Sequence, residues 1–414
     1  MKFTFLTYGT EGDTRPLVAL AHALARQGHD VHLLADASTR ASAQAHGVAF
    51  TALAGSMRDA LAPGGALADV VAGKGGAGRL ARAFAETARD QTTDWMRTAR
   101  EVAEGSDVLV FSGLASYAGL AVAEGLDLPC VGAGLWPMTP TGDFASLFLR
   151  TPGLPRWANR LSHRLVNALT WQMFRPAVNA GRKAVFGRAP RRRMWQGYPI
   201  LYGCSPALMP RPGDWTGEIE VCGAWHLPQS AYAPPPALRH FLDAGEAPIY
   251  VGFGSMAGFD RATLLRALKE AVGARRALFY PGWSGIDASA LPANFFVLGD
   301  TPHDWLFPRC SLVVHHGGAG TAHAAARSGV PSVVIPFAGD QFFWGRRMEE
   351  LGIAAVCPDA TRLDGAMLAQ LLAQASTRES HANALAVASR MRAEDGVALA
   401  CRRLREGVAQ RLRA

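Results

Sequence analysis

The fold of this 414-residue chain is decided by residues 311–341, which read SLVVHHGGAGTAHAAARSGVPSVVIPFAGDQ. This stretch predicts a buried strand at Leu312–His315, a glycine-rich turn at His316–Gly320 and an alanine-rich helix at Thr321–Ser328. A second apolar strand follows at Ser332–Pro336. A strand, a helix and another strand in this order form the βαβ unit of α/β proteins with parallel sheets.

The turn between the strand and the helix predicts an anion site. Its backbone N–H groups and the positive end of the helix converge on one point, where a phosphate binds favourably. The turn has no lysine and no G-x-G-x-x-G pattern, so a Walker loop and a dinucleotide fingerprint are both disfavoured. We expect His316 to donate to a phosphate oxygen, and Thr321 to cap the helix while contacting the same phosphate. His315 is interpreted as a packed residue at the end of the strand.

Two polar residues, Asp340 and Gln341, follow the next strand at the same edge of the predicted sheet. A carboxylate beside an amide can bind neighbouring hydroxyl groups, such as those of a hexose. A solvated turn would explain the pair in isolation, but its place one strand along from the anion site favours the sugar role.

The same alternation of strands and helices extends over the whole chain in two series. Strands are predicted at Phe3–Thr7, Val31–Leu34, Val108–Phe111 and Cys130–Gly132, and then at Ile249–Phe253, Ala277–Tyr280, Phe295–Leu298, Leu312–His315 and Ser332–Pro336. A proline-rich stretch between the series favours an extended linker. We therefore expect an α/β protein with two doubly wound, Rossmann-like domains facing each other across a cleft. The domains comprise residues 1–222 and 238–381, with a linker at 223–237 and a terminal helix at 382–414.

Composition excludes several classes of protein. Lysine and arginine (42) outnumber aspartate and glutamate (34), but only 18% of residues are charged and 49% are hydrophobic, as in ordinary globular domains. The basic excess favours anionic partners only weakly, and no nucleic-acid partner is expected. The six cysteines form no C-x-x-C pair, and no signal peptide or membrane-spanning run is recognisable. We expect a soluble protein of the reducing cytoplasm.

Residues 155–175 predict a helix with two neighbouring stripes. One stripe is apolar and the other is basic: Trp157, Leu161, Leu165 and Leu169 beside Arg156, Arg160 and Arg164. An arginine-rich amphipathic helix bearing a tryptophan can lie on an anionic membrane, so peripheral membrane contact is one interpretation. The pattern favours the other interpretation, a core-packed surface helix with a solvated arginine face.

Several motifs together resemble the inverting nucleotide-sugar glycosyltransferases, which include the UDP-glycosyltransferases, the sterol glucosyltransferases and bacterial natural-product glycosyltransferases. The matching segments are P-H-D-W-L-F-P (302–308), V-V-H-H-G-G-A-G-T (313–321), G-V-P (329–331), G-D-Q-F-F-W-G (339–345) and, at the N-terminus, G-T-E-G-D-T-R-P (9–16). They are most similar to the sterol glucosyltransferase and bacterial branch. The resemblance implies a GT-B fold, in which two Rossmann-like domains flank a cleft and a final helix crosses back to the N-terminal domain.

The resemblance also implies roles for individual residues. A nucleotide diphosphate sugar, with UDP-glucose favoured over dTDP-sugars, would bind the C-terminal half. His316, Thr321 and the backbone of Gly318, Ala319 and Gly320 would hold the diphosphate, and Ser255 would add a hydroxyl. Asp340 and Gln341 would hold the sugar. Pro302, His303 and Trp305 would lie near the base, although Trp305 does not align with the tryptophan on which plant members stack it.

The same resemblance places Asp13 as the general base that deprotonates the acceptor hydroxyl, in place of the histidine of plant members. The alternative interpretation of Asp13 is an N-cap for a helix predicted at Arg15–Gln27. The chain contains no Asp-x-Asp motif, so neither a metal nor another cofactor is expected. The oligomeric state stays open.

The acceptor is expected to be a lipophilic alcohol such as a sterol, terpenoid, polyketide or lipid. Its pocket is predicted around five residues of the N-terminal half, which are Gly12, Trp136, Met138, Phe144 and Phe148. Core packing would explain these apolar side chains equally well. Two other functions stay open: a binding protein that holds a nucleotide sugar without turnover, and a sugar-nucleotide epimerase of the same architecture.

Overall fold

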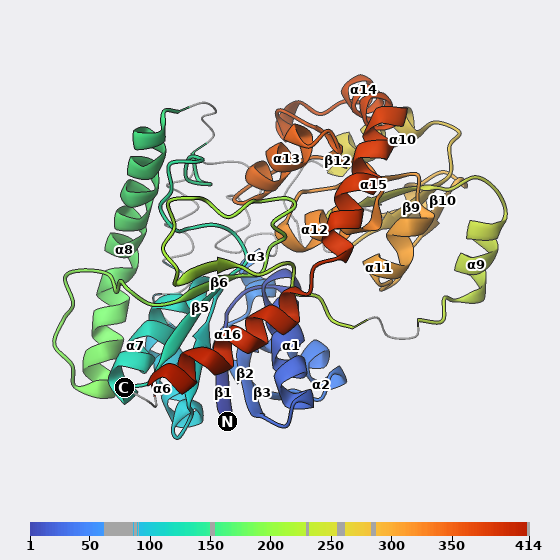
Figure 1. Cartoon of the computed structure of the whole chain (residues 1–414). Helices are drawn as coiled ribbons and strands as arrows, with labels where there is room; N and C mark the ends of the chain where they lie inside the picture. Colours follow the sequence, from blue (N-terminus) through green and yellow to red (C-terminus); the bar gives the residue numbers. More distant parts are fainter. Residues whose placement is uncertain are drawn as a thin grey trace.

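The structure is a computed structural model that describes residues 1–61, 86, 89, 91–149, 154–228, 232–254, 261–282 and 287–411. It has two lobes, each built on one sheet of parallel strands with helices packed around it (Figure 1). The predicted fold class is therefore confirmed. The lobes differ in size, with seven strands in the N-terminal sheet and six in the C-terminal sheet of the described chain.

The N-terminal sheet has the strand order β3-β2-β1-β4-β5-β6-β7. Its strands are β1 (Lys2–Leu6), β2 (Asp30–Asp36), β3 (Ala49–Leu53), β4 (Val108–Phe111), β5 (Cys130–Gly134), β6 (Ile200–Tyr202) and β7 (Ile219–Val221). Its helices are α1 (Glu11–Arg26), α2 (Arg40–Ala45), α3 (Met57–Leu61), α6 (Thr92–Ala103), α7 (Ser116–Leu126) and α8 (Arg156–Phe186). The sequence did not predict β3, β6 and β7, because two of them are three residues long and β3 is only partly buried.

The C-terminal sheet has the order β10-β9-β8-β11-β12-β13. Its strands are β8 (Ile249–Gly252), β9 (Ala277–Tyr280), β10 (Phe295–Val297), β11 (Leu312–His315), β12 (Ser332–Val334) and β13 (Ala354–Val356). Its helices are α9 (Pro236–Asp243), α10 (Arg261–Val272), α11 (His303–Leu306), α12 (Ala319–Ser328), α13 (Gln341–Glu350), α14 (Gly365–Ala375) and α15 (Arg378–Arg392). The predicted anion turn leaves the central strand β11, which pairs with both β8 and β12.

The C-terminal tail joins the lobes. It was predicted as one helix from residue 382, but it forms two helices, because α15 ends at Arg392 and α16 (Gly396–Arg411) begins after a short break. Helix α15 packs on α12 in the C-terminal lobe, whereas α16 packs on α1 in the N-terminal lobe (Figure 1). At the break, a Cβ on Gly396 would lie 2.4 Å from the Gly223 carbonyl group, so the two segments approach as closely as glycine allows.

The lobes also touch across the cleft. The Phe144 ring of the N-terminal lobe lies 5.0 Å from the Phe343 ring of α13. The Arg347 side chain donates to the Leu208 carbonyl oxygen at 2.9 Å. These contacts bring the carboxyl ends of the two sheets toward each other, which is where ligands of open α/β sheets bind.

Helix α8 contradicts the interpretation that was favoured from its sequence. Its stripe of Trp157, Leu161, Leu165 and Leu169 is exposed to solvent and does not pack in a core. The periodicity predicted the helix correctly, but the predicted burial of its apolar face is wrong. None of the helices in the described part of the chain combines the length and the apolar character of a membrane span.

Candidate functional site

The turn after β11 has the backbone geometry of an anion cradle. Gly317 has a positive φ of 89°, and a Cβ there would lie 2.7 Å from Val334 Cγ1. A Cβ on Gly318 would lie 2.5 Å from His316 Nε2. A side chain is thus excluded at Gly317, and one at Gly318 would displace the His316 ring. The backbone N–H groups at the start of α12 therefore lie beside a turn without side chains, as in other anion sites.

The helix begins two residues earlier than predicted. Its N-cap is Gly318 and its first residue is Ala319, so Thr321 lies in the first turn. The expectation that Thr321 caps this helix is therefore wrong, although its hydroxyl still lies in the first turn. The N–H groups of such a first turn have no acceptor within the helix.

His316 lies beside the end of β8. A Cβ on Gly254 would lie 3.3 Å from His316 Cε1, so the glycine permits the close approach of the imidazole. Burial, followed by the charge of nearby His303, lowers the pKa of His316 to about 4. Its Nδ1 is buried and has no hydrogen-bond partner within the described residues. A neutral imidazole in this place can donate one N–H to an anion in the cradle.

His315 has the structural role that its position predicted. It is fully buried at the end of β11, and its Nδ1 accepts a hydrogen bond of 3.0 Å from the Gly317 N–H. Burial lowers the pKa of His315 to about 3, so the ring stays neutral. This bond holds the turn that carries His316.

Asp340 reaches the same cradle from the start of α13. Its Oδ2 accepts a hydrogen bond of 3.2 Å from the Ala319 N–H, the first N–H of α12. Burial and the charge of Asp13 raise the pKa of Asp340 to about 7. This carboxyl group therefore occupies part of the helix start that the sequence assigned to a diphosphate.

The side chain of the neighbouring Gln341 forms hydrogen bonds with the backbone of the loop that precedes it. Its Oε1 accepts hydrogen bonds from the Phe337 N–H at 2.8 Å and from the Ala338 N–H at 3.1 Å. The amide oxygen thus shapes the loop before α13, and the side chain is buried.

Asp13 faces this group from the N-terminal lobe. It occupies the third position of α1, where its Oδ2 accepts hydrogen bonds from the Thr10 N–H at 2.8 Å and the Thr10 hydroxyl at 3.2 Å. The alternative interpretation as an N-cap is wrong, because Thr10 is the cap and the helix begins at Glu11. Burial raises the pKa of Asp13, and its charge in turn acts on Asp340. The structure thus brings one carboxyl group from each lobe together.

The segment predicted near the base divides into two parts. Pro302 caps α11, and the His303 ring stacks on Phe307 at 4.3 Å. Burial, followed by the positive charge of Arg15 in the other lobe, lowers the pKa of His303 to about 4, so the ring stays neutral.

Trp305 lies elsewhere, beside the linker. Its ring contacts the Tyr232 ring at 5.1 Å, and the Arg309 guanidinium lies 4.2 Å from its centre. Ser255, which was predicted to add a hydroxyl to the phosphates, lies outside the described residues.

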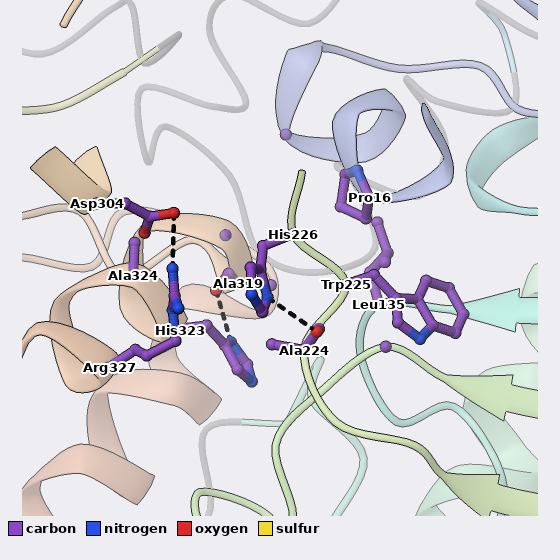
Figure 2. Close-up of a pocket in the computed structure, with 13 residues that line it drawn as sticks. Pro16, Leu135, Ala224, Trp225, His226, Asp304, Ala319, His323, Ala324 and Arg327 are labelled. Atoms are coloured by element: carbon purple, nitrogen blue, oxygen red, sulfur yellow. Dashed lines mark hydrogen bonds and ion pairs between the residues drawn. The ribbon is translucent and has the colours of Figure 1, made fainter. Parts of the chain in front are cut away.

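The predicted acceptor residues are spread along the cleft. Gly12 lines a crevice between the lobes together with Ala319 and Gly320. Figure 2 shows this crevice, with Ala319 on one side and Pro16 of α1 on the other. Phe144 contacts the C-terminal lobe, as described above. The backbone N–H of Met138 donates to the Tyr202 hydroxyl at 3.1 Å.

The two remaining residues of that set, Trp136 and Phe148, are partly buried. Trp136 packs against apolar clusters of both lobes.

Sequence reasoning missed a polar contact between the lobes behind the cradle. His323, one turn after Ala319 in α12, bonds to the Ala319 carbonyl oxygen at 2.7 Å through Nδ1 (Figure 2). Its Nε2 accepts a bond of 3.1 Å from the Ser205 N–H of the N-terminal lobe. The Ser205 hydroxyl donates to Glu394 at the break before α16. The only signal in the sequence was the position of His323 on the same helix face as Ala319.

An ion pair lines the same crevice. Arg327 of α12 pairs with Asp304 of α11 at 2.6 Å, and Figure 2 shows both beside His226 of the linker. The pair joins the helix that carries the cradle to the segment that carries His303.

Comparisons with known proteins agree with this geometry. Residues 3–108 match the family model of the glycosyltransferase family 28 N-terminal domain, and residues 277–406 match that of the erythromycin biosynthesis protein CIII-like C-terminal domain. The chain is 34% identical over 420 residues to a sterol 3-beta-glucosyltransferase of Eremothecium gossypii, covering 96% of this chain and 33% of that protein. It is 31% identical over 423 residues to a sterol 3-beta-glucosyltransferase of Arabidopsis thaliana, covering 97% and 67%.

Solved structures show the same fold at lower identity. The glycotransferase of kitacinnamycin superposes with a TM-score of 0.69 at 17% identity, covering 98% of this chain and 99% of that one. The spinosyn rhamnosyltransferase SpnG, solved with spinosyn aglycone, superposes with a TM-score of 0.65 at 21% identity, covering 98% and 100%.

This chain spans about a third of the fungal relative's length and about two thirds of the plant relative's length. Each lobe matches one of the two family models, and the plant relative matches nearly the whole chain. The chain therefore belongs to the UDP-glycosyltransferase family of GT-B fold that includes the sterol 3-beta-glucosyltransferases.

Proposed function

We propose that this chain transfers a hexose, with inversion at C1, from a nucleotide diphosphate sugar to a hydroxyl group of a lipophilic small molecule. UDP-glucose is the favoured donor and a sterol the favoured acceptor, because the relatives that match nearly the whole chain are named sterol 3-beta-glucosyltransferases. Structures of the same fold hold thymidine diphosphate or a spinosyn aglycone, so dTDP-sugars and polyketides are the next candidates. Terpenoids and other lipids are also candidates, because they too can carry a hydroxyl group on an apolar skeleton.

One observation carries the proposal: a glycine-rich helix start in one lobe faces an aspartate of the other lobe. The diphosphate would bind at the first turn of α12, where the N–H groups and His316 stabilise the negative charge that develops as the C1–O bond to the phosphate breaks. His316 is neutral, and a neutral imidazole carries one N–H that can donate a hydrogen bond to the diphosphate. Asp340 would then leave the Ala319 N–H and bind sugar hydroxyls.

Asp13 is proposed as the general base. In the transfer, the acceptor oxygen forms a bond to C1 while its proton passes to the Asp13 carboxylate, and the nucleotide diphosphate leaves with the electron pair of the broken bond. The raised pKa of Asp13 makes it a stronger base than an exposed aspartate. The bond from Thr10 holds one carboxyl oxygen, which leaves the other to accept the proton.

The transfer is proposed to need no metal ion, because the helix start and His316 supply the positive field at the diphosphate. Full activity in the presence of EDTA would support this point, and activity that returns only with Mg²⁺ or Mn²⁺ would contradict it. Five cysteines are buried as free thiols, which are Cys204, Cys222, Cys310, Cys357 and Cys401. They support our placement of the protein in a reducing compartment such as the cytoplasm.

The central experiment measures UDP release and product mass with UDP-glucose and cholesterol in detergent micelles. We expect UDP release that depends on cholesterol, together with a product heavier by one hexose. Donor binding without turnover, tested over a panel of sterol, terpenoid and polyketide alcohols, would favour the binding protein. Interconversion of the sugar nucleotide without any acceptor would favour the epimerase.

A further inference from the structure

The first half of α8 exposes apolar side chains in an unbroken stripe. The exposed fractions are 72% for Trp157, 55% for Leu161, 54% for Leu165 and 54% for Leu169. Residues four apart lie on neighbouring turns of one helix face, so the four side chains form one continuous surface. Four large apolar residues that line one helix face and are exposed to solvent are unusual for a monomeric soluble domain.

The opposite face of the same half-helix is polar and buried. Asn159 donates to the Gly142 carbonyl oxygen at 2.9 Å, and the Ser162 hydroxyl accepts from the Ser146 N–H at 2.9 Å. His163 bonds to the Phe144 carbonyl oxygen at 3.1 Å. An ordinary surface helix buries its apolar face and hydrates its polar one. Here the arrangement is reversed, so folding of the chain does not explain the apolar stripe.

A basic stripe runs beside the apolar one. Helix α8 contains five arginines and one lysine and no acidic residue. Arg156 pairs with Asp143 and Arg160 with Asp214, whereas Arg164 is exposed and has no carboxylate partner within the described residues. Arginine and tryptophan beside leucine are the residues that an interfacial helix uses at an anionic lipid surface, with the guanidinium groups at the phosphates.

The position of this surface relates it to the cleft. The first half of α8 stands at the outer edge of the N-terminal lobe (Figure 1). Its buried face holds the segment at residues 138–146, which includes Phe144 and reaches Phe343 of the other lobe. A membrane in contact with the stripe would thus lie one helix away from the predicted acceptor segment.

We infer that the first half of α8, residues 156–169, docks on the surface of an anionic lipid bilayer, from which the acceptor enters the cleft. The second part of this inference rests on the proposed function, whereas the docking itself does not. The helix would lie in the plane of the headgroups with its apolar stripe toward the acyl chains.

The docking test is sedimentation of the full-length chain with lipid vesicles, without donor or acceptor. Vesicles of phosphatidylcholine mixed with phosphatidylglycerol are compared with vesicles of phosphatidylcholine alone. We expect binding to the anionic vesicles, which weakens as salt rises. The affinity of the double variant Leu161→Gln/Leu165→Gln for these vesicles should fall by about tenfold or more, since two apolar side chains no longer enter the interface.

Matched control variants lie in the C-terminal lobe. Leu385 of α15 is 58% exposed, so Leu385→Gln removes an equally exposed leucine and should leave vesicle binding unchanged. For the charge, Arg164→Gln should weaken binding to the anionic vesicles several-fold, whereas Arg378→Gln, also on α15, should not. Because all five side chains are exposed, each variant is expected to fold, which circular dichroism verifies.

Three outcomes would overturn the docking. Wild-type protein could fail to bind anionic vesicles, or the Leu161→Gln/Leu165→Gln variant could bind as well as the wild type. The wild type could also be a dimer in light scattering that the double variant converts to a monomer, which would assign the stripe to a second copy of the chain.

The acceptor route is tested separately, by transfer to cholesterol in vesicles and in detergent micelles. The double variant should lose transfer from vesicles and keep transfer in micelles. Equal transfer from both would overturn the route, whereas absence of transfer by the wild type in micelles would overturn the proposed function and leave the docking result standing.

Discussion

Replacement of Asp340 by asparagine should stabilise the folded protein much more at pH 8 than at pH 5. The pKa of Asp340 is raised from 3.8 to about 7 by burial and by Asp13. Between these values the folded protein holds a proton that the unfolded chain releases. Stability therefore falls as the pH rises from about 4 to about 7, and it stays low above that range. Asparagine never ionises, and its amide oxygen can still accept the Ala319 N–H.

The magnitude follows from the shift. The full difference between a pKa of 3.8 in the unfolded chain and about 7 in the folded protein corresponds to roughly 4 kcal/mol in the free energy of unfolding. Asp340 is only partly buried, so we expect the measured gain in the free energy of unfolding to be roughly 1–2 kcal/mol. At about 2–4 °C per kcal/mol for a lobe of this size, Asp340→Asn should raise the Tm by a few degrees at pH 8.

The assay is thermal unfolding of both proteins at pH 5 and pH 8 in matched buffers and at one scan rate. Asp364 is an exposed helix-capping aspartate of the same lobe, so Asp364→Asn should shift the Tm equally at both pH values. An Asp340→Asn effect that is the same at pH 5 and pH 8, or a lower Tm at pH 8, would refute the reasoning about burial and Asp13.

The other predictions concern the reaction and the tail. Asp13→Asn should reduce transfer by about 10²–10⁴-fold with UDP-glucose affinity nearly unchanged, measured by UDP release and calorimetry; near-normal turnover would disprove the role as base. His316→Ala should weaken UDP binding by about tenfold to a hundredfold in calorimetry, because a hydrogen bond to a charged group is lost, and an unchanged Kd would remove it from the diphosphate site. Gly396→Ala places a Cβ 2.4 Å from the Gly223 carbonyl group and should cost about 2 kcal/mol or more in thermal unfolding, whereas Gly407→Ala meets nothing within 4 Å and should not destabilise the protein.

Much of the fold was predictable because its signals are local. The strands of the central sheet positions, β1, β4, β8 and β11, are apolar runs that periodicity detects. Strands β6, β7 and β13 were not predicted, because each is a run of three residues with too little periodicity to detect. Strands β10 and β12 are equally short but lie in longer apolar runs of the sequence, at 295–298 and 332–336. The break at residues 393–395 escaped for another reason: the contact of Gly396 with Gly223 depends on where two segments of distant sequence meet.

The sequence by itself determined the glycine-rich cradle, the two α/β halves and the family. Each of these rests on residues close together in the chain, whose hydrogen bonds and allowed backbone angles are local properties. The left-handed turn at Gly317 could be inferred in this way, and so could the helix that follows it.

Only the tertiary structure decided which side chains lie near each other and which face water. Asp13 and Asp340 are more than 300 positions apart, and the pKa of Asp340 is raised by burial and by that neighbour, neither of which spacing in the sequence reveals. The stripe on α8 has the period of a buried face, yet Trp157 is exposed, because the neighbouring segment bonds to the polar face of the helix. Periodicity fixes the faces of a helix, and packing against the rest of the chain fixes which of them is buried.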